Sequence, residues 1–412
     1  MSKVDETKNR IASKKISRRT FAQGMAATPL VVGAATRGVR KATAQEKTTI
    51  RFWTHTHPPM VDLNKQLIEE FQAANPDIEV QYDIIPNNEF ATKMLTSMGT
   101  GTGPDVINMD DNQMRSIYIP RGLVQPVDPA GLGYASMDEL QAAYIPGTFE
   151  GAAVDGQVYG LPSEYNVTAF AINNEAFTEA GVDPAAITTW EAVGTEGQKL
   201  VVKDGDSLTR RGFDFLYLHA GWYHNQLGTL MLQTGGTYVS DDGTTVTVNE
   251  PGTVQALQIW YDMIYKYQVA DPNVASREAT VPYQDFLDGN VAMSLLNPWG
   301  MGLVTEESAV YEKYSVVSLP QVNPDAGANP LYAYYWAVNS QTTDEAKKAA
   351  AFKWVAFLAS KPGPWLKNVN FIQPKIGWNE LPEAQEFPVL RCLGCGDVEG
   401  QVPAGHARSA AG

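Results

Sequence analysis

The sequence predicts an α/β protein of two lobes, and three observations support this prediction. The chain has 412 residues, which is more than a single hydrophobic core usually accommodates. Hydrophobic residues make up 44% of the chain and charged residues 19%, as in packed globular proteins. From residue 48 onward, strand-like segments alternate with helix-like segments, which is typical of parallel sheets with helical crossovers.

Residues 1–44 resemble an export signal more than a folded segment. They contain the twin-arginine sequence SRRTF at 17–21, a mildly apolar stretch at 22–35 and a small-x-small cleavage site at 42–44. This order of parts is similar to that of a Tat signal, and the apolar stretch is too short to anchor a protein in a bilayer. No cysteine lies near the cleavage site, so no lipid anchor is expected. The sequence therefore predicts a soluble, exported protein of the periplasm.

The chain that follows the signal is strongly acidic. Residues 1–44 carry ten Lys or Arg and two Asp or Glu, so the remainder has 21 basic and 44 acidic groups and a net charge of −23. Such a charge repels phosphate backbones and anionic lipids. We therefore expect no nucleic-acid binding and no polybasic membrane contact.

The segments after the signal predict a parallel sheet. The expected order is strand 48–54, helix 60–71, strand 78–85, helix 90–98 and strand 105–109. In open α/β sheets, ligands bind beyond the carboxyl ends of the strands. The polar outlets at His55 and Asp110 are therefore expected to face one crevice.

The later elements are shorter. Further strands are expected at 158–162, 167–173, 291–296, 314–319 and 332–339. Further helices are expected at 175–180, 190–202, 222–233, 253–267 and 342–358. Thr342 and Glu345 have the spacing of a capping box, which predicts that the last of these helices begins at this pair.

A series of motifs in one order resembles the extracellular solute-binding proteins, the maltose-binding-protein-like sugar-binding family of ABC importers. The motifs are TIRFW at 49–53, FxxxNPDIxV at 71–80, GPDV at 103–106, GLVxPVD at 122–128, DGQVYGLP at 155–162, TW at 189–190, GG at 235–236 and DGNVAM at 288–293, followed by Trp299. The resemblance implies a type II periplasmic-binding-protein fold. Each lobe would be a mostly parallel sheet flanked by helices, with the ligand cleft at the hinge.

The resemblance also implies a division of the chain. We expect residues 45–168 and 319–360 in lobe 1, and residues 169–318 and 361–412 in lobe 2. Crossings between lobes are expected near 167–172, near 318–320 and after Ser360. The family usually continues for several helices after residues 376–381, so lobe 2 is expected to be shortened at its C-terminus.

The function implied is that of a monomeric, periplasmic substrate-binding protein without a cofactor. It would bind a mono- or oligosaccharide and deliver it to membrane permease subunits of an ABC transporter. Sugar recognition combines aromatic faces, which stack on the apolar face of a pyranose, with carboxylates or amides that bind its hydroxyls. The candidate ligand contacts are Trp299, Asp110, Asp111, Asn112, His55, Glu164, Asn166, Trp222, Tyr223, Asn297, Tyr334 and Trp336.

Each candidate also has a structural alternative. Trp299 follows a strand at the place where the family has a stacking residue, yet it could serve packing alone. Residues 110–112 could be solvated caps of the next helix. Trp53 is expected in the core, with His55 and His57 as the cleft-facing alternatives. Alternation places Tyr332, Tyr334 and Trp336 on one face of their strand and Tyr335 on the other, so only some of these rings can face a ligand.

Catalytic and metal-binding patterns are weak. Cys392 and Cys395 are interpreted as an incidental pair or a local disulfide, with a metal site that includes His406 as the alternative. The HTH sequence at 55–57 is interpreted as a loop, with a metal site as the alternative. We expect no catalytic residue, no metal and no enzyme activity. Polyol or polyamine binding remains an alternative within the fold, and a secreted glycoside hydrolase is the enzyme alternative.

Overall fold

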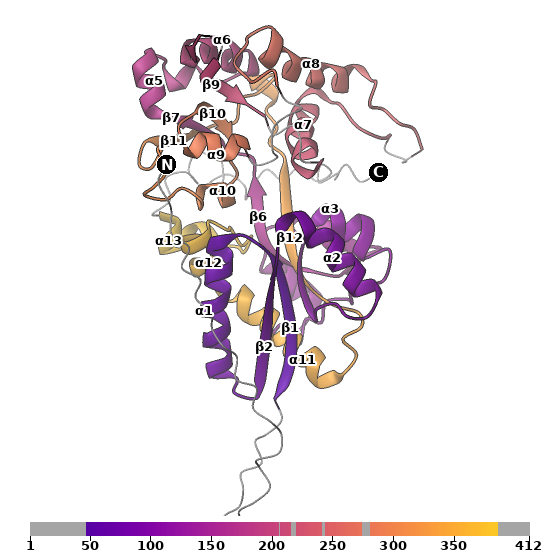
Figure 1. The fold of residues 1–412 in the computed structure, drawn as a ribbon. Coiled ribbons are helices and arrows are strands. Elements are labelled where there is room, and N and C mark those ends of the chain that lie inside the picture. Colours follow the sequence, from indigo (N-terminus) through magenta and orange to yellow (C-terminus); the bar gives the residue numbers. More distant parts are fainter. Residues whose placement is uncertain (1–46, 206, 216–219, 241–243, 274–280, 386–412) are drawn as a thin grey trace, which may run out of the picture. The chain divides into compact units, whose positions relative to one another are not determined.

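The computed structural model describes residues 47–205, 207–215, 220–240, 244–273 and 281–385, without the side chains of 220–225 and 281–282. Two five-stranded sheets organise these residues, in the orders β2-β1-β3-β12-β6 and β11-β7-β10-β9-β8 (Figure 1). The expected export signal and the residues Cys392, Cys395 and His406 lie outside the described part. Within that part, no helix has the length and apolar character needed to cross a membrane.

The first sheet contains the predicted parallel strands. Its strands are β1 (Thr48–His55), β2 (Ile78–Ile85), β3 (Val106–Asp110), β6 (Leu161–Val167) and β12 (Leu331–Val338). β1 pairs in parallel with both β2 and β3, which confirms the prediction made from their spacing. β12 runs antiparallel to β3 and to β6, so the sheet as a whole is mixed.

Helices pack on both faces of this sheet. The helices of this part of the chain are α1 (Pro58–Ala74), α2 (Asn87–Gly99), α3 (Asp111–Gln113), α4 (Met137–Ala142), α11 (Glu345–Ala359), α12 (Pro362–Val369) and α13 (Pro382–Gln385). Residues of α1, α4, α11 and α12 join one core, and residues of α2 join the core of the other face. On one face, Phe52 and Phe71 pack edge-on against the Trp354 ring at 5.7 and 5.0 Å between centroids. On the other face, Trp53 joins a separate core as expected, with Tyr335 in the same cluster. Trp336 lies in the first core, so the predicted alternation along β12 is confirmed.

The second sheet contains one parallel pair. Its strands are β7 (Phe170–Asn173), β8 (Val202–Asp204), β9 (Ser207–Asp214), β10 (Val291–Leu295) and β11 (Tyr314–Val317). Only β10 and β9 are parallel, whereas β10–β7, β11–β7 and β8–β9 are antiparallel. The expectation of a mostly parallel sheet was therefore wrong here. The chain enters β7 directly from β6 of the first sheet, and it leaves β11 toward β12 of the first sheet.

We call the first sheet with its helices the first half of the protein, and the second sheet with its helices the second half. The helices of the second half are α5 (Asn174–Ala180), α6 (Trp190–Leu200), α7 (Ala220–Thr234), α8 (Pro251–Tyr265), α9 (Val281–Leu287) and α10 (Pro298–Met301). Trp190, Phe170 and Phe213 form an aromatic cluster, with Trp190 centred 6.2 Å from Phe170 and 5.8 Å from Phe213. This cluster belongs to a core that shares no fully buried residue with the cores of the first sheet.

The chain passes between the sheets twice within the described residues before α11. It leaves β6 at Val167 and enters β7 at Phe170, and it leaves β11 at Val317 and enters β12 at Leu331. After Ser360 we expected a third crossing into lobe 2. Instead, Trp365 of α12 joins the core of the first sheet, where it stacks on Phe371 at 5.9 Å. This aromatic packing holds the described part of 361–385 against the first sheet, and Figure 1 shows α12 beside α1.

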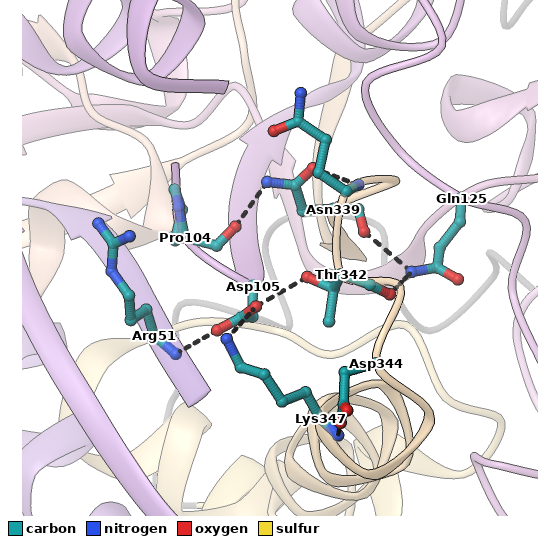
Figure 2. A network of polar contacts seen from close by, with 9 residues as sticks. Arg51, Pro104, Asp105, Gln125, Asn339, Thr342, Asp344 and Lys347 are labelled. Carbon is teal, nitrogen blue, oxygen red and sulfur yellow. Dashed lines mark hydrogen bonds and ion pairs between the residues drawn. The ribbon is translucent and has the colours of Figure 1, made fainter. Parts of the chain in front are cut away.

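The start of α11 differs from the predicted capping box. Asp344 caps the helix, since its carboxylate accepts a hydrogen bond from the Lys347 amide at 2.9 Å. Thr342 instead donates its hydroxyl to the Asp105 carboxylate at 2.8 Å, and the second oxygen of Asp105 accepts from the Arg51 amide at 2.8 Å (Figure 2). The capping-box prediction was wrong, because the Thr342 side chain does not cap α11. It binds Asp105 instead, and thereby links the segment before α11 to the starts of β3 and β1.

Candidate ligand site

A row of polar side chains crosses three neighbouring strands of the first sheet. Tyr334 of β12 lies opposite Asp110 of β3 on one side and opposite Glu164 of β6 on the other. In the next row, Tyr332 lies opposite Asn166. Residues that pair directly across strands point to the same face and come within reach of one another. The antiparallel entry of β12 between β3 and β6 therefore brings two acids, two tyrosines and an amide together.

Glu164 and Asn166 are buried without full hydrogen bonding. Glu164 is 3% exposed and Asn166 is 1% exposed. One carboxylate oxygen of Glu164 and both polar atoms of the Asn166 side chain lack a hydrogen-bond partner among the described residues. Burial raises the pKa of Glu164 to about 8. Each buried polar group left unpaired in this way lowers the stability of the folded protein by about 1–3 kcal/mol. A ligand that forms hydrogen bonds with these groups would remove that cost, which favours binding.

Asp110 combines a capping role with its place in the row. Its carboxylate accepts from the Gln113 backbone amide at 3.0 Å and from the Gln113 side chain at 2.7 Å, at the start of α3. Burial raises the pKa of Asp110, and burial together with the charge of Asp110 raises that of Asp111 to about 7. Asn112 is exposed, and its backbone amide donates to Asp111 at 2.8 Å. Asp110 therefore caps α3, as the structural alternative expected. This capping holds its carboxylate in place at the end of β3.

His55 adds a neutral ring beside the row. It is the last residue of β1, and its ring packs against Phe90 at 5.6 Å and Tyr334 at 5.9 Å. Burial, with a smaller contribution from His57, lowers the pKa of His55 to about 4. At neutral pH the imidazole is therefore uncharged, and it contributes an aromatic wall rather than a cation.

Trp299 reaches the row from the other half of the protein. It lies in the short helix α10, directly after β10 of the second sheet. Its indole nitrogen donates to the Tyr332 hydroxyl at 2.8 Å, and its ring lies 5.2 Å from that of Tyr283. Trp299 packs against cores of both halves, and its side chain remains half-buried. The geometry thus combines an indole ring, tyrosine hydroxyls and buried acid and amide oxygens.

The sequence of the chain decides its family. Residues 58–363 match the sequence model described as bacterial extracellular solute-binding protein, which is more than half of the chain. The chain belongs to this family. A putative binding protein of Brucella abortus is 25% identical over 302 residues, covering 70% of this chain and 67% of that protein. The arabinooligosaccharide-binding protein of Halalkalibacterium halodurans is 24% identical over 259 residues, covering 62% of this chain and 55% of that protein.

Solved structures show the same fold. The maltose-bound MalE3 protein of T. maritima superposes with a TM-score of 0.73 at 21% sequence identity, covering 84% of this chain and 86% of that chain. This solute-binding protein therefore has the two-lobed type II fold that its motifs predicted. The family and the structures it resembles are binding proteins, and no group of three or more His, Cys, Asp or Glu in the described chain is arranged to hold a metal ion.

Some predicted site residues of this solute-binding protein lie elsewhere. Asn297 is 1% exposed, and its amide donates to the Val167 carbonyl at 3.1 Å, where the chain crosses between sheets. Trp336 is 3% exposed and packs 5.8 Å from Trp365, so it belongs to the core of the first sheet rather than to the proposed site. The side chains of Trp222 and Tyr223 lie outside the described residues.

Three site residues were not selected from the sequence. Alternation placed Tyr332 on the correct face, but nothing indicated its bond to Trp299. His57 is 6% exposed, and its Nε2 atom lies 3.3 Å from the Trp299 carbonyl oxygen. The sequence indicated His57 as a cleft-facing alternative to Trp53, but it did not indicate this contact. Tyr283 begins no recognisable motif, and its contact with the Trp299 ring depends on tertiary packing alone.

Proposed function

We propose that this chain is the substrate-binding component of an ABC importer and that it binds a mono- or oligosaccharide between its two halves. Two proteins that it resembles have such ligands: one is named arabinooligosaccharide-binding protein, and the structure of the other contains maltose. The twin-arginine segment at 17–21 supports export to the periplasm, where a membrane permease would receive the ligand.

One observation carries the choice of ligand. Unpaired polar atoms of Glu164 and Asn166 are buried beside the rings of Tyr332 and Tyr334, and Trp299 reaches the same place. A sugar offers hydroxyls that pair with such atoms and an apolar face that stacks on such rings. Because the pKa of Glu164 is about 8, its carboxyl is mostly protonated at pH 7 and offers both a donor and an acceptor. This favours a neutral, hydroxyl-rich ligand over a cation.

Binding would act by shifting a conformational equilibrium, without bond-making or bond-breaking. Contacts from the first sheet, such as Asp110 and Glu164, and contacts from the second sheet and its helices can reach one ligand together only in a closed arrangement. The ligand therefore stabilises that arrangement by its differential affinity. A permease that recognises the closed form would then receive loaded protein in preference to empty protein.

The test is a thermal-shift and calorimetry screen of the purified full chain. The panel contains arabinotriose, maltose, maltotriose, mannitol, glycerol 3-phosphate and putrescine, since a ligand that binds only the folded state raises its melting temperature. We expect a rise with at least one sugar. A rise with putrescine alone would replace carbohydrate by a cationic ligand. Release of smaller sugars from an oligosaccharide, followed by chromatography, would replace the binding function by a hydrolase.

A further inference from the structure

His57 lies between the two halves of the protein, next to Trp299. It occupies the N-cap of α1 and is 6% exposed. Its ring lies 6.0 Å from the Trp299 ring at an interplanar angle of 78°, and 5.5 Å from the Phe371 ring at 32°. His57 therefore belongs to the first half, yet it touches α10, which follows the second sheet.

The hydrogen bonds of His57 define its protonation. Nδ1 accepts from the Met60 backbone amide at 3.4 Å, and Nε2 lies 3.3 Å from the Trp299 carbonyl oxygen. An amide N–H only donates and a carbonyl only accepts, so both contacts are met by the neutral ring with its proton on Nε2. Burial lowers the pKa of His57 to about 4, although the bond to Trp299 works in the other direction. Both ring nitrogens of His57 are thus occupied by backbone groups.

The helix that carries Trp299 needs outside support. α10 contains only Pro298–Met301, and its N-cap residue Asn297 makes no side-chain capping bond. A helix this short does not hold its conformation in isolation, because nucleation is unfavourable. Trp299 is nevertheless fixed at two points by residues of the first half: its carbonyl by His57 and its indole by Tyr332.

We infer that His57 is a positioning residue, which orients Trp299 by binding its backbone carbonyl while capping α1. The inference rests on the proposed function, in which Trp299 stacks on the ligand. A ring that is already oriented loses less conformational freedom on binding, so affinity rises without any contact between His57 and the ligand. His57 also ties the first turn of α1 to α10, so the two halves share one hydrogen-bonded junction beside the ligand site.

Two substitutions separate the two hydrogen bonds. His57→Asn keeps an acceptor at the position of Nδ1, where asparagine is a strong N-cap, but its side chain is too short to reach Trp299. His57→Gln places an amide N–H near the position of Nε2 and serves as the conservative rescue of the bond to Trp299. Ser136→Ala is the matched control, since Ser136 caps α4 through a 3.1 Å bond to the Glu139 amide and has no link to Trp299.

The first readout needs no ligand. The chain has nine tryptophans, and the indole ¹⁵N–¹H resonance of Trp299 is assigned by its loss in Trp299→Phe. In His57→Asn we expect the Trp299 indole proton to exchange with solvent faster, while His57→Gln and Ser136→Ala keep the wild-type exchange rate. The chemical shift moves in both His57 variants, because each loses the imidazole ring 6.0 Å from the indole, so the exchange rate is the deciding quantity. Melting temperature should change by no more than a few degrees in each variant, as expected for one hydrogen bond or cap.

The second readout is maltotriose affinity by calorimetry. We expect His57→Asn to weaken binding about five- to tenfold, as for loss of one hydrogen bond, and His57→Gln to restore most of it. An unchanged exchange rate of the Trp299 indole proton in His57→Asn, or equal affinity losses in His57→Gln and His57→Asn, would overturn the positioning role. If wild-type protein binds no carbohydrate, the proposed function fails, and the ligand-free Trp299 signal still decides the role of His57.

Discussion

The indole nitrogen of Trp299 donates to the Tyr332 hydroxyl across 2.8 Å, and this bond joins α10 of the second half to β12 of the first. Tyr332 in turn lies opposite Asn166, one row from the Glu164–Tyr334 pair. The ring and the unpaired polar atoms therefore belong to one continuous group of side chains. Their separate contributions to binding can be measured by removing the ring or only its hydrogen bond.

The first prediction compares Trp299→Ala with Tyr332→Phe. Loss of the indole removes roughly 3 kcal/mol of ring contact, so carbohydrate affinity should fall about 100-fold. Tyr332→Phe keeps both rings and removes one acceptor, so the loss should be about fivefold. Calorimetry with the best sugar of the screen measures both. Wild-type affinity in Trp299→Ala would show that the ring serves packing alone.

The second prediction concerns the pH dependence of stability through Glu164. The folded-state pKa is about 8, against an ordinary value of 4.5, so the folded carboxyl keeps its proton where the unfolded one has lost it. Unfolding then releases a proton, and the free energy of unfolding falls as pH rises from about 4.5 to 8. Glu164→Gln lacks this effect. Its melting temperature relative to wild type should rise by a few degrees between pH 4.5 and pH 8 and level off above.

Asp111, whose pKa is raised to about 7, titrates in the same range but is present in both proteins and cancels in the difference. Glu69→Gln is the control, because Glu69 is exposed on α1. A melting-temperature difference for Glu164→Gln that stays flat from pH 4.5 to pH 8 would mean that Glu164 is ionised in the folded protein.

Much of the first sheet could be predicted from the sequence, because the order of β1, α1, β2, α2 and β3 follows from local periodicity. The strand β9 could not. Its Arg210 and Arg211 look unlike a strand interior, but Arg210 pairs with Glu179 at 2.7 Å and Arg211 with Asp214 at 3.2 Å. Glu179 is distant in sequence and Asp214 lies on the strand itself, and both compensate the charge of an arginine. Two adjacent arginines without visible partners do not resemble a strand in the sequence, so β9 was not predicted.

The candidate site was predictable in kind but not in arrangement. The sequence indicates Asp110 at a strand end, Glu164 near a crossing between lobes and Tyr334 within a strand, each on separate grounds. Their alignment depends on the register of β12 between β3 and β6, including the irregularity at Tyr334/Tyr335. Register between strands far apart in the sequence is set by packing of whole faces, which no local motif encodes. The same limit explains why the contact of His57 with Trp299 was not foreseen.

The third prediction separates the junction at Asp105 from the cap of α11. Asp105→Ala leaves the Arg51 amide and the Thr342 hydroxyl without their acceptor and frees Lys347, 3.2 Å away, so it should cost about 3 kcal/mol in urea unfolding. Asp344→Ala removes one cap and should cost about 1 kcal/mol. Glu345→Ala should be near neutral, because the capping box is not formed.

None of these three changes should alter ligand affinity. Asp105 precedes β3 and Asp110 ends it, a separation of about 16 Å along an extended strand. A large cost from Glu345→Ala with no cost from Asp344→Ala would contradict the observed start of α11.

The last prediction sets stability against function at Asn166. Both polar atoms of its side chain are buried and lack partners among the described residues. In the ligand-free protein the free-energy cost of their desolvation is therefore not offset by hydrogen bonds. Asn166→Leu and Asn166→Ala remove these atoms. We expect the melting temperature of the ligand-free protein to stay equal or rise by a few degrees, while carbohydrate affinity falls at least tenfold.

Asn108→Leu provides the contrast on the same sheet. Asn108 is also buried, but its amide donates to the Ser163 hydroxyl at 2.8 Å, so its loss leaves Ser163 unpaired and should lower stability by about 1–3 kcal/mol. Opposite signs at two buried asparagines would identify Asn166 as a group retained for a ligand. A destabilised Asn166→Leu that binds sugar as tightly as wild type would instead make Asn166 part of the scaffold, and the ligand would have to be sought away from β6.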